Sequence, residues 1–338
     1  MKKWLALVLT VFFAFSFAAC NDDRTTPGGE GGNTQTYEIY MPDGAPALAM
    51  AKLIKDDEQF GETVHYTVVA AANIGASVLQ KKADVAIMPV TAASKTIGSG
   101  EEYVLLGVVT HGNIYVMSSG SVSSLADLKG QVIGVIGQGQ VPDVTFRALL
   151  DKNAIGYEVV DANQTPAADK VGIRYFADAS ALLPLMKTGQ LANGLLPEPA
   201  ATKITTMNPD VSMKIDIQEV YGGDYPQAVL VAKKSITESD PAFLKALMTA
   251  IEENAEWISA NDENAASAVD AINSALAEGV TPSLSKDAIN KAVVENCNIY
   301  LQLAADAKTS VNEYLAAMKA VDGDSASAVS DAFFCTLS

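Results

Sequence analysis

Short apolar runs of strand length alternate with helical patterns along most of this chain, and this alternation constrains its fold most strongly. The candidate strands lie within TYEIY, VHYTVVAA, DVAIMPV, YVLLGVV, IYVMS, QVIGVIG, GYEVVDA, GIRYF, NGLLP and QAVLVAK. Helical patterns between them cover 45–55, 74–82, 143–153 and 178–188. The alternation predicts an α/β fold with largely parallel sheets. About 300 residues follow the polar N-terminal region, which suits two domains of ordinary size.

The pattern changes from Asp240 onwards, where no strand is apparent. The segment DPAFLKALMTAIEENAEWISAN opens with Asp-Pro, which is a helix start signal. Further helices are predicted over 263–277, 285–306 and 309–320. We interpret this stretch as a helical C-terminal extension that packs against the rest of the protein.

The N-terminal residues indicate export from the cytoplasm. Lys2 and Lys3 precede an apolar run that is shorter than an ordinary membrane span, so 1–19 is predicted to be a signal peptide. The run ends in FAAC, which resembles the lipobox of bacterial lipoproteins, with Cys20 as the lipidated residue; the alternative is a plain signal peptide. Residues 20–36 are polar and predict a flexible tether. The expected location is the outer face of the cytoplasmic membrane, with membrane contact through the lipid anchor only.

Charge and cysteine content exclude several classes of partner. The chain has 23 basic and 40 acidic residues, a formal net charge of −17, and cleavage before Cys20 would remove two of the basic residues. This acidity argues against a nucleic-acid partner and against adsorption to anionic lipid. Cys297 and Cys335 form no CxxC or Cys/His cluster, so no metal site is predicted. They fit either a disulfide that pins the C-terminal tail or two buried thiols.

Two segments share one order of features. VLQKKADVAIMPVTAA (78–93) and LMKTGQLANGLLPEPAA (185–201) each contain a helix end, a small polar turn, a buried strand and a proline, Pro89 or Pro197. Two lobes of like construction would place strand carboxyl ends face to face. Ligands of open α/β sheets bind at such ends.

Three segments resemble type II solute-binding proteins of ABC importers. SVSSLADLKGQVIGVIGQGQVPDVTFRALLDKNAI (121–155) resembles the start of their second lobe. ADVAIMPVTAA resembles a strand-end segment of their first lobe, and LLPLMKTGQLANGLLPEPAA resembles their "L…G…EP" segment. The resemblance extends over 37–260. The branch it indicates contains the nitrate, sulfonate and taurine binders and the thiamine-pyrimidine binders.

The resemblance implies a two-lobed periplasmic-binding-protein type II fold with two crossover hinge strands, near His111–Ser118 and Gln227–Ala232. Lobe one would comprise 37–113 plus 230–338, and lobe two 114–229. Such a protein captures a small-molecule solute by lobe closure and delivers it to an ABC permease and ATPase complex. It is expected to be a monomer that uses no cofactor and catalyses no reaction.

The predicted ligand-binding residues lie in turns at strand ends and at the crossings. They are Asp43, Gly44, Ala45, Asn73, Pro89, Thr91, His111, Asn113, Gln138, Gln140, Glu198, Tyr221, Asp224 and Tyr225. Asp43 and Asn73 have helix capping as an alternative role, and capping is the preferred role of Asp143. Glu198 is either a site carboxylate or part of a solvated turn, and His111 is either a ligand contact or structural.

The charges of these turns favour one class of ligand. The turns carry the carboxylates of Asp43, Asp143, Glu198 and Asp224 and no Lys or Arg. An anion would depend on helix N-termini beside opposing carboxylates, whereas an amine or ring N–H suits a carboxylate directly. The aromatic rings beside Gly222 could stack on a flat ligand or pack on the surface. We predict a neutral or cationic, flat solute such as an aminopyrimidine.

Three alternative functions stay open at this point. The first is a sulfonate- or taurine-like anion binder on the same scaffold. The others are a sensory lipoprotein and an enzyme of thiamine or menaquinone synthesis. The chain contains no G-x-S-x-G, HExxH or Walker A motif, which disfavours the enzyme.

Overall fold

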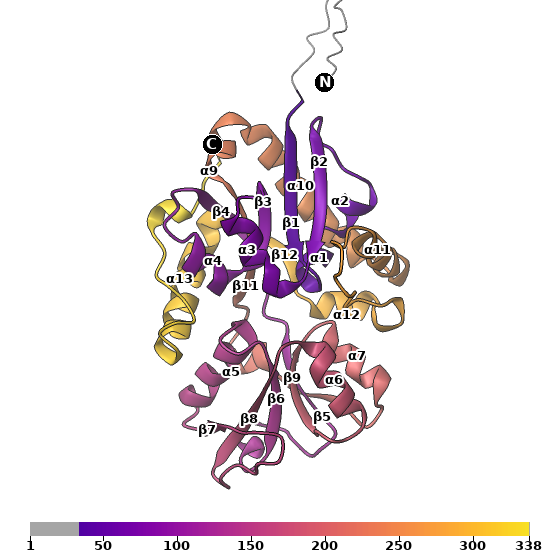
Figure 1. The fold of residues 1–338 in the computed structure, drawn as a ribbon, viewed down its shortest axis with the longest axis vertical. Helices are drawn as coiled ribbons and strands as arrows, with labels where there is room; N and C mark the ends of the chain where they lie inside the picture. The colour runs from indigo at the N-terminus through magenta and orange to yellow at the C-terminus, as the bar shows by residue number, and fades with distance from the viewer. Residues whose placement is uncertain (1–33, 338) are drawn as a thin grey trace, which may run out of the picture. The chain divides into compact units, whose positions relative to one another are not determined.

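The computed structural model describes residues 34–337. The predicted signal peptide, Cys20 and the tether up to residue 33 lie outside the described residues. From Thr34 onwards the chain forms one compact unit that contains two six-stranded sheets, each flanked by helices (Figure 1). The predicted α/β class is confirmed.

The first sheet has the strand order β12-β4-β11-β3-β1-β2. Its strands are β1 (Thr36–Pro42), β2 (Thr63–Val69), β3 (Val85–Pro89), β4 (Tyr103–His111), β11 (Pro226–Lys233) and β12 (Ile299–Leu303). β1 runs parallel to β2 and β3, whereas β11 runs antiparallel to both β3 and β4. Every residue of β4 is buried, so this strand lies at the centre of the core.

The second sheet has the strand order β10-β5-β9-β6-β8-β7. Its strands are β5 (Ile114–Ser118), β6 (Val132–Ile136), β7 (Gly156–Val159), β8 (Lys170–Phe176), β9 (Asn193–Pro197) and β10 (Ser212–Asp216). β7, β8, β6 and β9 are parallel neighbours, and β5 runs antiparallel to β9 and β10. Both sheets are therefore mixed, and the prediction of largely parallel sheets holds only in part. β11 and β12 run antiparallel to their neighbours in the first sheet, and β5 does so in the second.

The two sheets have the same internal arrangement. In the first, β11 enters beside β3 with Ala228 opposite Pro89; in the second, β5 enters beside β9 with Ile114 opposite Pro197. The repeat between 78–93 and 185–201 thus corresponds to equivalent places in the two sheets. The chain passes from β4 to β5 through only Gly112 and Asn113.

Thirteen α-helices of the described residues surround these sheets. They are α1 (Ala45–Leu48), α2 (Ala51–Lys55), α3 (Ile74–Leu79), α4 (Val90–Thr96), α5 (Val141–Lys152), α6 (Ala179–Lys187), α7 (Ala200–Met207), α8 (Ile217–Tyr221), α9 (Lys234–Ser239), α10 (Pro241–Ile258), α11 (Asp262–Ser274), α12 (Lys291–Asn296) and α13 (Ala304–Val321). Single 3₁₀ turns cover Ala71–Asn73, Leu125–Leu128, Lys286–Ala288 and Asp331–Phe333. The predicted helix over 45–55 is two short helices. Asp240 caps α10 by accepting a hydrogen bond from the Phe243 N–H.

The predicted helix over 285–306 is wrong. α12 ends at Asn296, Asn298 takes a positive φ of 53°, and β12 follows before α13 begins. β12 pairs with β4, so a tertiary contact overrides the local helical pattern. The prediction of no strand after Asp240 is wrong for the same reason.

One apolar cluster runs through both sheets. It joins Met88 and Val229 of the first sheet to Ile133 and Leu195 of the second, and it includes Val311 of α13. Burial of each such side chain contributes roughly 1.5–3 kcal/mol. Within 34–337, no helix is both long and apolar enough to cross a bilayer.

Candidate functional site

The predicted residues follow the carboxyl ends of the parallel strands. Asp43 follows β1, and Thr91 lies in the first turn of α4 after β3. Gln138 follows β6, and Glu198 follows β9. The fold therefore places each of these turns where open α/β sheets bind ligands.

Asp43 does not cap α1. Gly44 occupies the N-cap position with a φ of 106°, a conformation that favours glycine, and Ala45 begins the helix. One Asp43 oxygen, Oδ2, accepts a hydrogen bond from the Ser283 N–H at 2.6 Å. The other, Oδ1, is buried without a hydrogen-bond partner among the described residues. The capping alternative is wrong, and one carboxylate oxygen stays uncommitted.

A lysine that the sequence analysis did not place here lies next to this contact. Lys203 of α7 donates from Nζ to the Ser283 carbonyl at 3.1 Å. Ser283 therefore joins the turn after β1 in the first sheet to a helix of the second. The premise that no Lys or Arg stands near these turns is wrong. Lys203 lies only five residues after Glu198, but nothing local to Asp43 indicates Ser283 as the link.

Glu198 is a buried carboxylate and not part of a solvated turn. It is 2% exposed and accepts hydrogen bonds from the Thr202 N–H at 2.9 Å and the Thr202 hydroxyl at 2.7 Å. Its own N–H donates to the Asn113 carbonyl. Asn113 lies in the link between β4 and β5, which we call the crossing. Burial raises the pKa of Glu198, and hydrogen bonds from Thr202 and Asn296 act in the opposite direction.

The crossing itself carries two buried polar side chains. Asn113 donates weakly to the Cys297 carbonyl at 3.5 Å, and its Oδ1 has no partner among the described residues. His111 is 2% exposed and stacks on Tyr300 with ring centroids 3.6 Å apart. Burial lowers the pKa of His111 to about 4, although Gln302 and Asp224 oppose this shift. The imidazole is therefore neutral at pH 7.

The segment before β11 packs within the protein. Asp224 accepts hydrogen bonds from Asn298 at 2.8 Å and from the Tyr300 hydroxyl at 3.2 Å. Tyr225 is buried and lies parallel to Tyr314 of α13 at 5.4 Å between centroids. Tyr221 tilts against Tyr225 at 4.9 Å. Both tyrosine rings therefore have aromatic partners within the protein.

Other predicted residues lie at helix starts without capping them. Asn73 is exposed and precedes α3, and Gln140 is exposed and precedes α5, yet neither side chain caps its helix. Gln138 is exposed on the same turn as Gln140. The Asp143 side chain accepts from the Gly139 N–H, which lies before the helix, so capping by Asp143 is also wrong. Thr91 is buried, and Pro89 directly precedes α4.

Unpartnered buried polar atoms concentrate at the crossing. Besides His111 and Asn113, they include Nε2 of Gln218 and Oε1 of Gln227. Gln218, which the sequence analysis missed, uses its Oε1 to accept from the Ile114 N–H and the Tyr225 hydroxyl. Buried polar atoms normally have hydrogen-bond partners, so these atoms suit a bound polar molecule or water.

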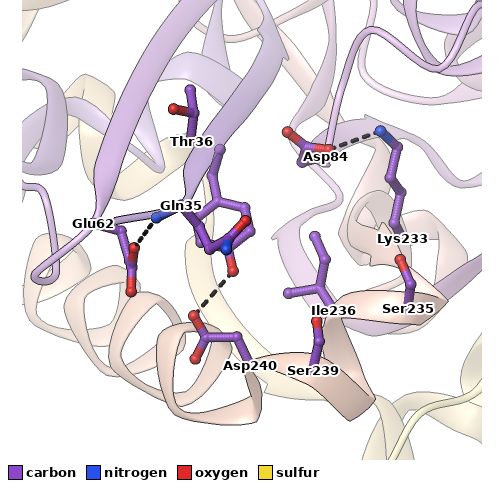
Figure 2. A pocket seen from close by; sticks show the side chains of 10 residues that line it. Gln35, Thr36, Glu62, Asp84, Lys233, Ser235, Ile236, Ser239 and Asp240 are labelled. Carbon is purple, nitrogen blue, oxygen red and sulfur yellow. Dashed lines mark hydrogen bonds and ion pairs between the residues drawn. The ribbon is translucent and has the colours of Figure 1, made fainter. Parts of the chain in front are cut away.

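Two cavities lie away from these turns. One of about 590 Å³ opens at the amino end of β1, where Tyr37 donates to Asp240 at 2.9 Å and Lys233 pairs with Asp84 at 2.7 Å (Figure 2). The other, of about 280 Å³, is lined by residues that include His65. Neither contains a predicted site residue. Among residues 34–337, no three His, Cys, Asp or Glu side chains cluster as metal ligands would, and Cys297 and Cys335 are both free thiols.

The chain is similar to a family and to several solved structures. The NMT1/THI5-like family model matches residues 67–265, more than half of the chain. An ABC transporter structure from Parabacteroides distasonis shares 16% identity, covers 90% of this chain and 100% of its own, and has a TM-score of 0.70. A ligand-binding component of an ABC-type import system from Staphylococcus aureus shares 11%, with coverages of 90% and 99% and a TM-score of 0.62. The aliphatic sulphonate binding protein SsuA from Escherichia coli shares 11%, with coverages of 83% and 87% and a TM-score of 0.61. No curated protein matches the chain in sequence.

Proposed function

Because this chain belongs to the NMT1/THI5-like family, we propose that it is the solute-binding component of an ABC importer. It has the two-lobed periplasmic-binding-protein fold of its structural neighbours. The protein captures a small organic solute between a first lobe (37–113 plus 230–338) and a second lobe (114–229). It then delivers the solute to a permease and ATPase complex, acting as a monomer without a cofactor and without catalysis.

The group of unpartnered buried polar atoms at the crossing carries this proposal. His111, Asn113 and Gln218 each keep at least one such atom where the two sheets join, and Asp43 keeps one at the end of β1. Leaving a buried donor or acceptor unsatisfied costs roughly 1–3 kcal/mol, which a bound solute recovers. The carboxyl ends of parallel strands from both sheets supply the surrounding turns.

The uncommitted atoms favour a solute rich in N–H donors. Oδ1 of Asp43, Oδ1 of Asn113 and Oε1 of Gln227 are acceptors, whereas Nε2 of Gln218 is a donor. Glu198 adds a buried carboxyl group, whose two oxygens also accept from Thr202. A neutral or cationic, flat heterocycle such as an aminopyrimidine offers amine and ring N–H donors to these oxygens.

A sulfonate-like anion is the second candidate, and Lys203 favours it. Its ammonium bonds to Ser283, the residue that also holds Asp43, so a positive charge stands at the edge of the proposed site. Two structural neighbours are sulfonate-binding proteins by name. The Asp43 carboxylate opposes an anion at the same place.

Calorimetric titration of the purified protein against aminopyrimidines and alkanesulfonates tests the solute class. We expect an aminopyrimidine to bind and Asp43→Asn to weaken its binding by about 10- to 100-fold, because a hydrogen bond to a charged group contributes about 1.5–3 kcal/mol. The substitution keeps an oxygen for the Ser283 N–H. Glu101→Gln, at an exposed site, is the matched control. Tight binding of alkanesulfonates with no response to pyrimidines would reject the aminopyrimidine class.

Lipidation of Cys20 has its own test. The FAAC sequence supports an acylated N-terminal cysteine, so we expect metabolic labelling with a radioactive fatty acid to mark the wild-type protein in its native host. Cys20→Ser should remove the label and release the protein from membranes. Equal labelling of both forms would contradict the anchor.

A further inference from the structure

A buried carboxylate organises the turn that precedes α5. Asp143 is 0% exposed and accepts four hydrogen bonds. Arg147 donates two of them, from Nε and Nη2, each at 3.0 Å. The Tyr175 hydroxyl and the Gly139 N–H donate the others, each at 2.8 Å. The Gly139 N–H belongs to the Gly137–Gln140 turn, so Asp143 fixes this turn to Arg147.

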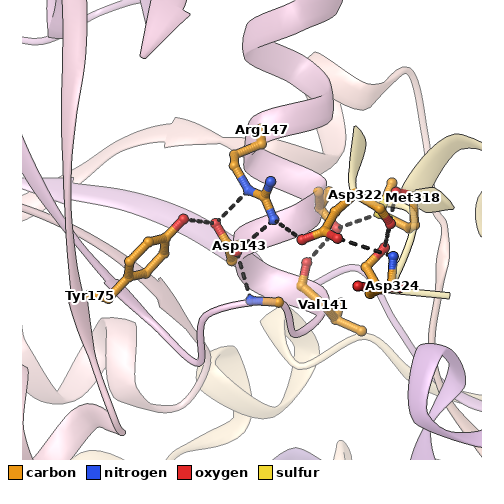
Figure 3. A network of polar contacts seen from close by, with 10 residues as sticks. Val141, Asp143, Arg147, Tyr175, Met318, Asp322 and Asp324 are labelled. Atoms are coloured by element: carbon orange, nitrogen blue, oxygen red, sulfur yellow. Dashed lines mark hydrogen bonds and ion pairs between the residues drawn. The ribbon is translucent and has the colours of Figure 1, made fainter. Parts of the chain in front are cut away.

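Arg147 also binds a carboxylate from the far end of the chain. Its Nη2 donates to Oδ2 of Asp322, the residue that follows α13, at 3.1 Å (Figure 3). Burial alone lowers the pKa of Arg147, but the two carboxylates outweigh burial and raise it above its ordinary value. The hydrogen bond from Arg147 in turn lowers the pKa of Asp322. Arg147 therefore stays charged and binds both acids.

The contact joins elements of the two lobes. α13 packs against β4 and β11 of the first sheet, whereas α5 packs against β6 and β9 of the second. A second contact lies beside it, because the Thr145 hydroxyl of α5 and the Tyr314 hydroxyl of α13 are 2.6 Å apart.

We propose that Arg147 is a positioning residue that ties the Gly137–Gln140 turn to the C-terminal segment and holds the two lobes in the arrangement seen here. This connection, which we call the tie, runs from the Gly139 N–H through Asp143 and Arg147 to Asp322. Arginine is needed because its planar fork can bind Asp143 with two donors and still reach Asp322, which a lysine ammonium cannot do with the same geometry. The division into two lobes rests on the proposed function, whereas the contact between Arg147 and Asp322 involves no solute.

The tie is tested in solute-free protein by measuring the distance between the lobes. Spin labels at Leu79→Cys on α3 and Val159→Cys on β7, both exposed sites, report this distance by pulsed electron spin resonance in a Cys335→Ser background. We expect Asp322→Asn to increase the more open population about threefold, as for a partly exposed ion pair. High salt should have a similar effect on the wild type and little further effect on the variant.

Two further variants separate the tie from a general structural role. Asp322→Glu keeps the charge and should restore the wild-type distances. Asp270→Asn removes the Lys286–Asp270 pair within the first lobe, and it should leave the distances and their salt response unchanged. The proposal is overturned if Asp322→Asn, folded as judged by circular dichroism, gives the wild-type distances at both salt concentrations. Should Asp322→Asn fail to fold, Arg147→Lys provides the same comparison, and unaltered distances there would also overturn it. All of these measurements use solute-free protein, so they test the contact even if the proposed solute-binding function is wrong.

Discussion

Replacing Asp143 with alanine is expected to lower the free energy of unfolding by about 3–5 kcal/mol, the cost of removing one partner from a buried ion pair. The substitution removes the bidentate partner of Arg147, and it also leaves the Tyr175 hydroxyl and the Gly139 N–H without their acceptor. Urea denaturation followed by circular dichroism measures the change. The loss is large because four donors converge on one carboxylate that has no exposed surface.

A double-mutant comparison identifies the cause of that loss. Arg147→Met removes the guanidinium that Asp143→Ala would leave unpaired. The double variant is therefore expected to be more stable than the sum of the two single losses implies. Asp151→Ala lies on the same helix at an exposed position and is the matched control. A loss of less than 1 kcal/mol for Asp143→Ala would contradict the assigned role, because a merely peripheral carboxylate costs about that much.

Acidification from pH 7 to pH 5 is expected to remove about 2 kcal/mol of stability through His111 alone. The pKa of His111 is lowered to about 4 by burial, whereas an unfolded histidine titrates near its ordinary value of 6.5. Between these values the unfolded chain binds a proton that the folded chain does not. The stability associated with the neutral His111 side chain is therefore fully present above about pH 6.5. It is lost progressively as the pH falls towards 4.

His111→Phe keeps an aromatic ring to stack on Tyr300 and removes the titrating group. Urea denaturation at pH 5, 6 and 7 should therefore show a weaker pH dependence in this variant than in the wild type. The other histidine of the chain, His65, is exposed, and His65→Gln is measured in parallel as the comparison variant. Parallel pH profiles for His111→Phe and wild type would show that His111 is not the group responsible.

Ten strands were predictable because each lies in a short segment that is rich in apolar, aromatic and β-branched residues. β3 and β9 lie almost wholly in the core, so their sequences need no partner to be recognised. β10 and β12 were missed because both lie at sheet edges and carry exposed side chains. β12 becomes a strand by pairing with β4, which is distant in sequence. The local signal available in the sequence was the residue type of Asn298, because asparagine tolerates the positive φ that it adopts after α12.

The candidate site was only partly predictable for a similar reason. Turns after strands are local features, so Asp43 and Glu198 could be named from their neighbours in sequence. Their surroundings are not local: the Ser283 N–H that binds Asp43 lies 240 residues away. The C-terminal segment was interpreted as packing alone, although it supplies Ser283, Asn298 and Asp322 to the contacts described here. Lys203 changed the expected charge of the site through one of these distant contacts.

The place of β11 in the first sheet has a consequence for the order of folding. β11 lies between β3 and β4, yet the ribosome makes it only after all six strands of the second sheet. The second sheet comes from one continuous stretch of chain and can be completed during synthesis. The facing edges of β3 and β4 stay unpaired until β11 has been made. A chain that stops before Pro226 lacks β11 and therefore presents those edges to other chains, and aggregation is its expected fate.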